Sequence, residues 1–416
     1  MKILTEKMRL LQNTILLMGS MVLLRVFSAA TTIVLTHWLT LEDYGRFSYG
    51  QSVALLLMFG VSVGLPTFIV KDLAGKTENA AMLLTSCLKL IVFLTLIECT
   101  VVGAIFLFGG FPQGLAGTVI PMSIGGGALA GNMVMQAFFR AYDRFALQAT
   151  LLSLQGVMML VILLTVAKLF DSSAAVAWAF AGSTGFIFSV HLAFTIRITG
   201  WSWLSQFQFT ELLRKTISFG LIDWIMAGYP LVVGTGLLLF KGAAEVGIFY
   251  AGFAVFGAIS IMALVLDQIF IREILRSDRG QQIKIARTYI AIAFVAGVSA
   301  GAIVFFSAGL LASLFFAETQ PMLVLVLQMF SFALAFRFVG MASSSFERLN
   351  GAQNKILLIH FTGLCLLMLV MPWALQWGLV GGAAAMVILE LCLAIVFVFR
   401  TYFLGKTLCI PLAGKP

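Results

Sequence analysis

Charge is what this sequence has least of. Only 10% of its 416 residues are charged, whereas 61% are hydrophobic. A soluble domain usually carries about a quarter charged residues. This shortage excludes an ordinary soluble globular protein, and it leaves no region polar enough for a soluble domain of useful size. We therefore predict an all-α integral membrane protein.

Cysteines and catalytic motifs are also scarce. The chain has five cysteines and no C-x-x-C pair, so neither a disulfide framework nor a metal centre is indicated. It has no glycine-rich phosphate loop and no nucleophile–base arrangement. We therefore predict no cofactor, no metal and no enzymatic activity. The net charge of +9 is better explained by basic cytoplasmic loops than by a nucleic-acid partner.

Long apolar runs are what the sequence does have. Each is long enough to cross a bilayer as a helix. The predicted spans are 11–38, 46–70, 80–109, 115–139, 146–168, 174–197, 216–240, 246–270, 286–312, 321–343, 356–376 and 379–404. The first is too long for a signal peptide and lacks a small-residue cleavage site, so we expect it to be retained. The pattern predicts twelve transmembrane helices.

Basic residues alternate from one side of the predicted helices to the other. They gather at both termini and in every second loop, while the opposite loops hold only Arg46, Lys168 and Lys241. Cytoplasmic loops carry the excess of Lys and Arg in membrane proteins. Both termini are therefore predicted to be cytoplasmic.

A short motif occurs twice. Asp43-Tyr-Gly-Arg-Phe-Ser-Tyr-Gly50 begins the second span, and Glu245-Val-Gly-Ile-Phe-Tyr-Ala-Gly252 begins the eighth. An even number of spans separates the copies, so the halves share one orientation, as in transporters with parallel repeats. The repeat predicts two six-helix lobes, at 1–199 and 216–416, related by a pseudo-two-fold axis along the membrane normal. Two acidic turns that merely cap helices are the competing explanation.

The segment 200–215 between the lobes is aromatic, amphipathic and basic at its end. It is predicted to be a cytoplasmic interfacial linker. An ordinary loop with interfacial tryptophans would show the same pattern.

Few ionisable residues lie inside the predicted spans. Each is a candidate functional residue, because its cost in the bilayer must be offset. Arg25, Lys89 and Arg337 are the candidate cavity cations, and a guanidinium does not deprotonate. Acidic candidates for ion coupling are Glu98, Asp223 and Glu390. Lys89 could instead extend to the nearby interface, and the acidic residues could instead be structural.

Several motifs together resemble the polysaccharide flippase family, the lipid-linked oligosaccharide translocases of the multidrug/oligosaccharidyl-lipid/polysaccharide superfamily. The most specific is the turn Leu39-Thr-Leu-Glu-Asp-Tyr-Gly-Arg-Phe47 after a helix with a deep arginine. The others are Ser52, Gly60–Pro66, Lys71–Ala74, Gln136–Arg144 and Leu212–Gly220. The chain departs from the family pattern at the seventh helix, where Ser218-Phe-Gly220 replaces a Pro-Leu pair and the proline lies deeper, at Pro230.

The resemblance implies alternating access around a central cavity in the bacterial inner membrane. The implied substrate is an undecaprenyl-diphosphate-linked oligosaccharide of the O-antigen type, moved from the cytoplasmic to the periplasmic leaflet for lipopolysaccharide biosynthesis. A monomer is expected, with polysaccharide polymerase and chain-length proteins as candidate partners. Independently of the resemblance, arginine matches the oxygens of a diphosphate in a bidentate manner.

Two other functions compete with this interpretation. A multidrug/cation antiporter of the same superfamily would need acidic cavity residues for a cationic drug, whereas the first helix here carries Arg25. A membrane enzyme, such as a polymerase or acyltransferase, would need a large outer loop or a His-Asp site, and neither is visible.

Overall fold

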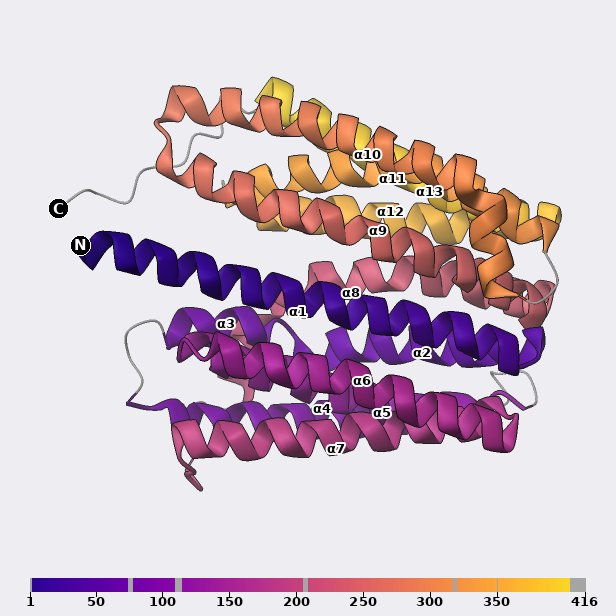
Figure 1. Ribbon diagram of the computed structural model, residues 1–416, viewed down its shortest axis with the longest axis horizontal. Helices are drawn as coiled ribbons and strands as arrows, with labels where there is room; N and C mark the ends of the chain where they lie inside the picture. The colour runs from indigo at the N-terminus through magenta and orange to yellow at the C-terminus, as the bar shows by residue number, and fades with distance from the viewer. Residues whose placement is uncertain are drawn as a thin grey trace. The chain divides into compact units, whose positions relative to one another are not determined.

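A computed structural model describes residues 2–73, 78–108, 114–204, 209–316, 320–349 and 351–404. All of the regular structure in these ranges is helical (Figure 1). The helices are α1 (Lys2–Trp38), α2 (Leu41–Ser62), α3 (Leu65–Asp72), α4 (Ala80–Leu107), α5 (Ala116–Ala141), α6 (Phe145–Phe170), α7 (Ser173–Thr199), α8 (Phe209–Phe240), α9 (Ala243–Arg276), α10 (Arg279–Phe315), α11 (Pro321–Leu349), α12 (Gln353–Ala374), η1 (Leu375–Trp377), α13 (Gly378–Phe399) and η2 (Arg400–Leu404).

These helices confirm the predicted all-α membrane fold. The described residues contain 11 stretches long and apolar enough to cross a membrane. The last of them, Gln353–Tyr402, contains both α12 and α13, so every predicted span is helical, and the second one is divided between α2 and α3. The chain is a multi-pass membrane protein.

The helices group into two compact units, residues 1–231 and 232–416. We call them unit 1 and unit 2. The division falls inside α8, and the segment 200–215, predicted as a linker, lies within unit 1. Part of that segment is outside the described residues, and Phe209 already begins α8. Trp201 and Trp203 pack edge to face there, with ring centroids 5.5 Å apart.

Helix α5 is the centre of unit 1, where it packs against α2, α4 and α7. Three consecutive glycines make this possible, because successive helix residues point about 100° apart. A Cβ on Gly125 would lie 2.7 Å from the ring of Phe180 in α7. On Gly126 it would lie 2.6 Å from the carbonyl oxygen of Ala54 in α2, and on Gly127 2.5 Å from Thr95 in α4. Each glycine therefore admits a different neighbouring helix.

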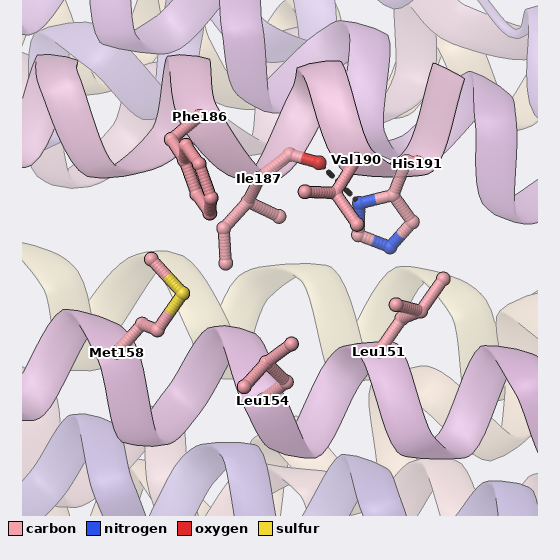
Figure 2. A pocket seen from close by; sticks show the side chains of 7 residues that line it. All are labelled: Leu151, Leu154, Met158, Phe186, Ile187, Val190 and His191. Atoms are coloured by element: carbon pink, nitrogen blue, oxygen red, sulfur yellow. Dashed lines mark hydrogen bonds between the residues drawn. The ribbon is translucent and has the colours of Figure 1, made fainter. Parts of the chain in front are cut away.

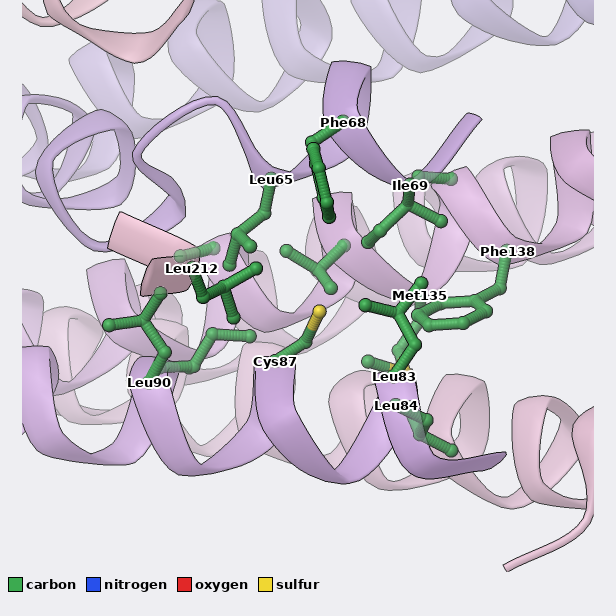
Figure 3. Packing of buried hydrophobic residues seen from close by; sticks show 14 of the residues in the cluster. Leu65, Phe68, Ile69, Leu83, Leu84, Cys87, Leu90, Met135, Phe138 and Leu212 are labelled. Atoms are coloured by element: carbon green, nitrogen blue, oxygen red, sulfur yellow. The ribbon is translucent and has the colours of Figure 1, made fainter. Parts of the chain in front are cut away.

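A buried apolar cluster joins α3, α4 and α5 in unit 1 (Figure 3). Leu65 and Ile69 of α3 meet Leu83 and Cys87 of α4, and all four are fully buried. Burying a side chain of this size contributes about 1.5–3 kcal/mol. Cys87 thus acts as a small apolar core residue, as the sequence predicts, whereas Cys392 of α13 is exposed.

Helix α11 has the central position in unit 2, where it packs against α9, α10 and α13. Small residues again allow close approach, since a Cβ on Gly297 of α10 would lie 2.8 Å from the backbone of Ala335. The contact between α11 and α13 is different, because charged side chains pair across it.

The second predicted span is not a single helix. Val63 and Gly64 both adopt left-handed backbone angles, with φ of 39° and 74°, and they separate α2 from α3. A β-branched residue rarely adopts this conformation, so tertiary packing must hold it. A Cβ on Gly64 would lie 2.7 Å from the backbone nitrogen of Gly220 in α8. The backbones of α8 and of the break therefore touch directly.

The two copies of the repeated motif make corresponding contacts in their own units. Asp43 forms a reciprocal cap with Thr40 and accepts a 2.7 Å hydrogen bond from Ser173, at the start of α7. The Glu245 carboxylate lies 3.4 Å from the Cβ position of Gly378, at the start of α13. Each acidic residue therefore lies near the start of another helix of its own unit, but only Asp43 forms a hydrogen bond there.

Candidate functional site

Arg25 lies on the exposed side of α1 in unit 1. Its neighbours Leu24 and Phe27 pack onto Gly156 of α6, with Phe27 2.6 Å from the Cβ position of that glycine. The close α1–α6 contact thus turns Arg25 outward, and its side chain is exposed. Within the described residues it makes no ion pair or hydrogen bond. A guanidinium inside a membrane span is costly unless a polar or anionic group offsets its charge.

Lys89 of α4 is also exposed and has no ion-pair partner within the described part of the chain. Two nearby residues of α4, Cys87 and Leu90, are buried in the core. The core therefore faces one side of α4, and Lys89 faces another. A flexible ammonium group at this position can reach an anionic headgroup or the membrane interface.

The structure brings together Arg337 and Glu390, two of the predicted site residues. Arg337 of α11 donates from Nη1 to Oε1 of Glu390 in α13 at 3.2 Å. Glu390 is buried and Arg337 is half-buried, while Nε of Arg337 is buried without a partner. From the sequence, Arg337 is predicted as a cavity cation and Glu390 as an ion-coupling residue. In the structure the two charges compensate each other. Arg337 is consequently the weakest of the three candidate cations.

Glu98 has a different environment from Glu390. It lies on α4, and its Oε1 would be 2.6 Å from a Cβ on Gly60 of α2. The indole Nε1 of Trp224 in α8 would be 3.1 Å from the same point. Oε2 of Glu98 is buried and has no hydrogen-bond partner in the described residues. The partly buried carboxylate therefore lies against α2 and α8, and the described part of the chain gives it no ion-pair partner.

Asp223, His191 and His360 lie on three different helices. Asp223 is exposed on α8 and directly precedes Trp224. His191 of α7 is fully buried, with Nδ1 3.0 Å from the carbonyl oxygen of Ile187. His360 of α12 is buried against Phe397 of α13, with ring centroids 5.4 Å apart. His191 is in unit 1 and His360 in unit 2, and each is buried by its own packing contacts.

The cavity beside His191 is small and apolar (Figure 2). It lies between α6 and α7, with Leu151, Leu154 and Met158 facing Phe186 and Ile187. Its volume of about 10 Å³ is no larger than one water molecule needs. A wider apolar hollow of about 410 Å³ lies between α10, α11 and α13 of unit 2. None of the six predicted site residues lines either hollow.

The sequence did not predict a second ion pair, nor the residues that pack beside Glu98. Nε of Arg400 donates to both oxygens of Glu347, at 2.8 and 3.0 Å. Glu347 lies just beyond its predicted span, so it was not counted as intramembrane. Gly60 and Trp224 carry no charge. No pattern in the sequence links Gly60 of α2 or Trp224 of α8 to Glu98 of α4.

No protein-family model matches this chain, and no curated protein matches it. Solved structures do match over nearly its whole length. One is the inward-facing conformation of a multidrug resistance MATE-family transporter of the MOP superfamily, with 16% identity, a TM-score of 0.69, and 92% of this chain and 95% of that chain covered. The outward-facing conformation of such a transporter has 17% identity, a TM-score of 0.66 and 96% of both chains covered.

A third match is a MOP-superfamily transporter from Pyrococcus furiosus. It has 16% identity, a TM-score of 0.68 and 96% coverage of both chains. That protein is described as having a binding pocket of reverse polarity, which suggests a different function for it. At these identities the likeness shows the fold, and the chain has the fold of MATE-family transporters.

Proposed function

We propose that this protein is a flippase for an undecaprenyl-diphosphate-linked oligosaccharide, working by alternating access in the bacterial inner membrane. The observation that carries the proposal is Arg25, an exposed guanidinium in a membrane helix with no partner among the described residues. The transporter fold supports a transport role, since proteins with this fold are described in inward- and outward-facing conformations.

The substrate follows from the sign of the exposed charge. A diphosphate carries about two negative charges, which cannot cross hydrocarbon without compensation. Arg25 offers a planar pair of donors that matches phosphate oxygens, and Lys89 adds a second exposed cation in unit 1. Arg337 contributes less, because Glu390 already offsets its charge. The apolar tail stays in the lipid while the headgroup moves.

A multidrug/cation antiporter is the competing function, because the similar structures include multidrug transporters. A pocket for cationic drugs requires unpaired acidic groups. Glu98 meets that requirement, whereas the exposed Arg25 opposes it. The proposal also includes two untested expectations, that both termini are cytoplasmic and that polysaccharide-assembly proteins are partners.

Everted membrane vesicles that carry a labelled diphosphate-linked oligosaccharide test the proposal. We expect Arg25→Ala to lower flipping about 10- to 100-fold, because it removes charge-assisted hydrogen bonds of about 1.5–3 kcal/mol. Arg25→Lys should retain part of the activity, since it keeps the charge without the bidentate geometry. The matched control is Lys168→Ala, which removes an exposed positive charge at the end of α6.

Two results would reject the flippase. One is full activity of Arg25→Ala at equal protein abundance. The other is extrusion of a cationic dye by vesicles that show no movement of the oligosaccharide, which would favour the antiporter.

A further inference from the structure

The second feature of unit 1 that demands an explanation is the Glu98 carboxylate. Its Oε1 occupies the space that a side chain at position 60 would take, and Trp224 closes the same space from α8. The glycine at position 60 is thus what admits the carboxylate between the helices. This is a fitted position for a polar group.

Among the described residues, no cation pairs with this carboxylate. The helices packed on α4 are α2, α5 and α7. Helix α8 reaches it through Trp224 and through Phe209, whose ring meets that of Phe93 edge to face. Their charged and titratable side chains, with those of α4, are Glu42, Asp43, Tyr44, Arg46, Tyr49, Cys87, Lys89, Cys99, Arg140, His191, Arg197, Glu211, Arg214, Lys215, Asp223 and Tyr229. Within the described residues none of these groups forms an ion pair or a hydrogen bond with Glu98.

Among the described residues, the two glutamates with buried side chains, Glu347 and Glu390, are both paired, whereas Glu245 of α9, like Glu98, has a buried Oε2 without a hydrogen-bond partner. Arg337 donates to Glu390 and Arg400 to Glu347. An ionised carboxylate that is buried without a partner is strongly disfavoured, and such a group normally takes up a proton instead. Glu98 is less buried than either of these residues, but its buried Oε2 has no guanidinium partner in the described part of the chain.

The end of α2 adds to this preference. The helix stops at Ser62 because Val63 and Gly64 turn into the left-handed region. Its last carbonyl groups, which carry partial negative charge, therefore lie within one turn of Gly60. Negative helix-end charge beside Glu98 disfavours the carboxylate further and favours a bound cation.

We propose that Glu98 is a proton-binding site, closed by Gly60 and Trp224 in this conformation. The carboxylate takes one proton from water on one side of the membrane to form the neutral acid. When the contacts with α2 and α8 open, the O–H bond breaks and the proton leaves to water on the other side. The further step, in which this exchange drives substrate movement, rests on the proposed flippase function.

Dicyclohexylcarbodiimide tests the site without any transport substrate, because it reacts with protonated carboxyl groups in apolar surroundings. The full-length protein in detergent micelles is treated over a series of pH values, and the adducts are located by peptide mass spectrometry. We expect an adduct on Glu98 that increases as the pH falls. We expect several-fold less on Glu347 and Glu390, because a guanidinium group already contacts each of these carboxylates.

Matched glycine variants test the geometry. Gly60→Ala places a methyl group where Oε1 now lies, so labelling of Glu98 should fall several-fold or change its pH dependence. Gly103→Ala, in α4 itself, meets nothing within 4 Å and should label like the wild type. Equal labelling of all three glutamates, or none of Glu98 at any pH, overturns the proposal. Protection of Glu98 by sodium but not potassium at constant pH would also overturn it, in favour of a sodium site.

Vesicle transport separates this proposal from the proposed function. If the wild type flips the oligosaccharide in response to a pH gradient, Glu98→Gln should remove that response. An unchanged response in the Gln variant refutes the coupling. Wild-type vesicles that do not flip the oligosaccharide at all refute the flippase, and the labelling experiment then decides the proton site alone.

Discussion

The central helices of the two units, α5 and α11, make different kinds of contact with α7 and α13 respectively. In unit 1, α5 meets α7 through glycine and aromatic side chains, with Phe180 against Gly125 and Phe188 against Gly131. In unit 2, α11 meets α13 and η2 through Arg337–Glu390 and Glu347–Arg400. Both contacts join helices at equivalent places in the two halves of the chain.

This difference shows that one packing arrangement can be stabilised by two kinds of interaction. The glycine contact depends on shape and dispersion, which act only at close range. The ion pairs depend on charge, and both residues of each pair must be present. The two pairs also run in opposite senses, because α11 supplies the cation of one pair and the anion of the other. The two contacts should therefore fail in different ways.

The largest effect is expected from Gly126→Leu in unit 1. A Cβ at this position already lies 2.6 Å from the backbone oxygen of Ala54, which cannot move without displacing α2. We expect loss of the folded, monodisperse protein, measured by size-exclusion chromatography in detergent. Gly182→Leu in α7 is the control, since nothing lies within 4 Å of that Cβ position. Equal folded yields for the two variants would contradict the close-packing explanation.

The next effect is expected from Glu347→Ala in unit 2. It leaves the Arg400 guanidinium without its partner, and Nη2 of that group is already buried and unpaired. Removing one partner of a buried ion pair costs about 3–5 kcal/mol, which thermal unfolding in detergent would detect as a marked fall in Tm. The double variant Glu347→Ala/Arg400→Met should recover much of that loss. If it is no more stable than the single variant, the pair does not act through charge.

The smallest effect is expected from Glu390→Gln. Its single contact with Arg337 is longer, at 3.2 Å, and Arg337 is less buried than Glu347. An amide can still accept a hydrogen bond from the guanidinium, so we expect a loss of about 1–2 kcal/mol in the same unfolding measurement. A loss as large as that of Glu347→Ala would show that the two pairs stabilise unit 2 equally.

Helix positions could be predicted from the sequence, because a bilayer requires long apolar runs and hydropathy is a local property of the sequence. The break at Val63 could not, because it depends on backbone contact with Gly220, far along the chain. The Arg337–Glu390 pair was hidden for the same reason. Each residue was recognised as intramembrane and charged, but periodicity does not show which side chains meet across helices.

The location of Arg25 was predictable, whereas its exposure was not. Whether a residue of α1 faces outward depends on which face packs on α6, and this follows from Gly156 accepting Phe27. For Glu98, the sequence left structural and functional roles open. The enclosing residues, Gly60 and Trp224, lie on two other helices.

The contact between Gly64 and Gly220 has an evolutionary consequence. A Cβ on Gly64 would lie 2.7 Å from the nitrogen of Gly220, and one on Gly220 would lie 2.5 Å from the nitrogen of Gly64. Neither position can gain a side chain while the other backbone stays in place. Relatives that retain the break after α2 should therefore keep glycine at both positions, and those that lose one glycine should lose the other. We therefore expect the residues at positions 64 and 220 to covary.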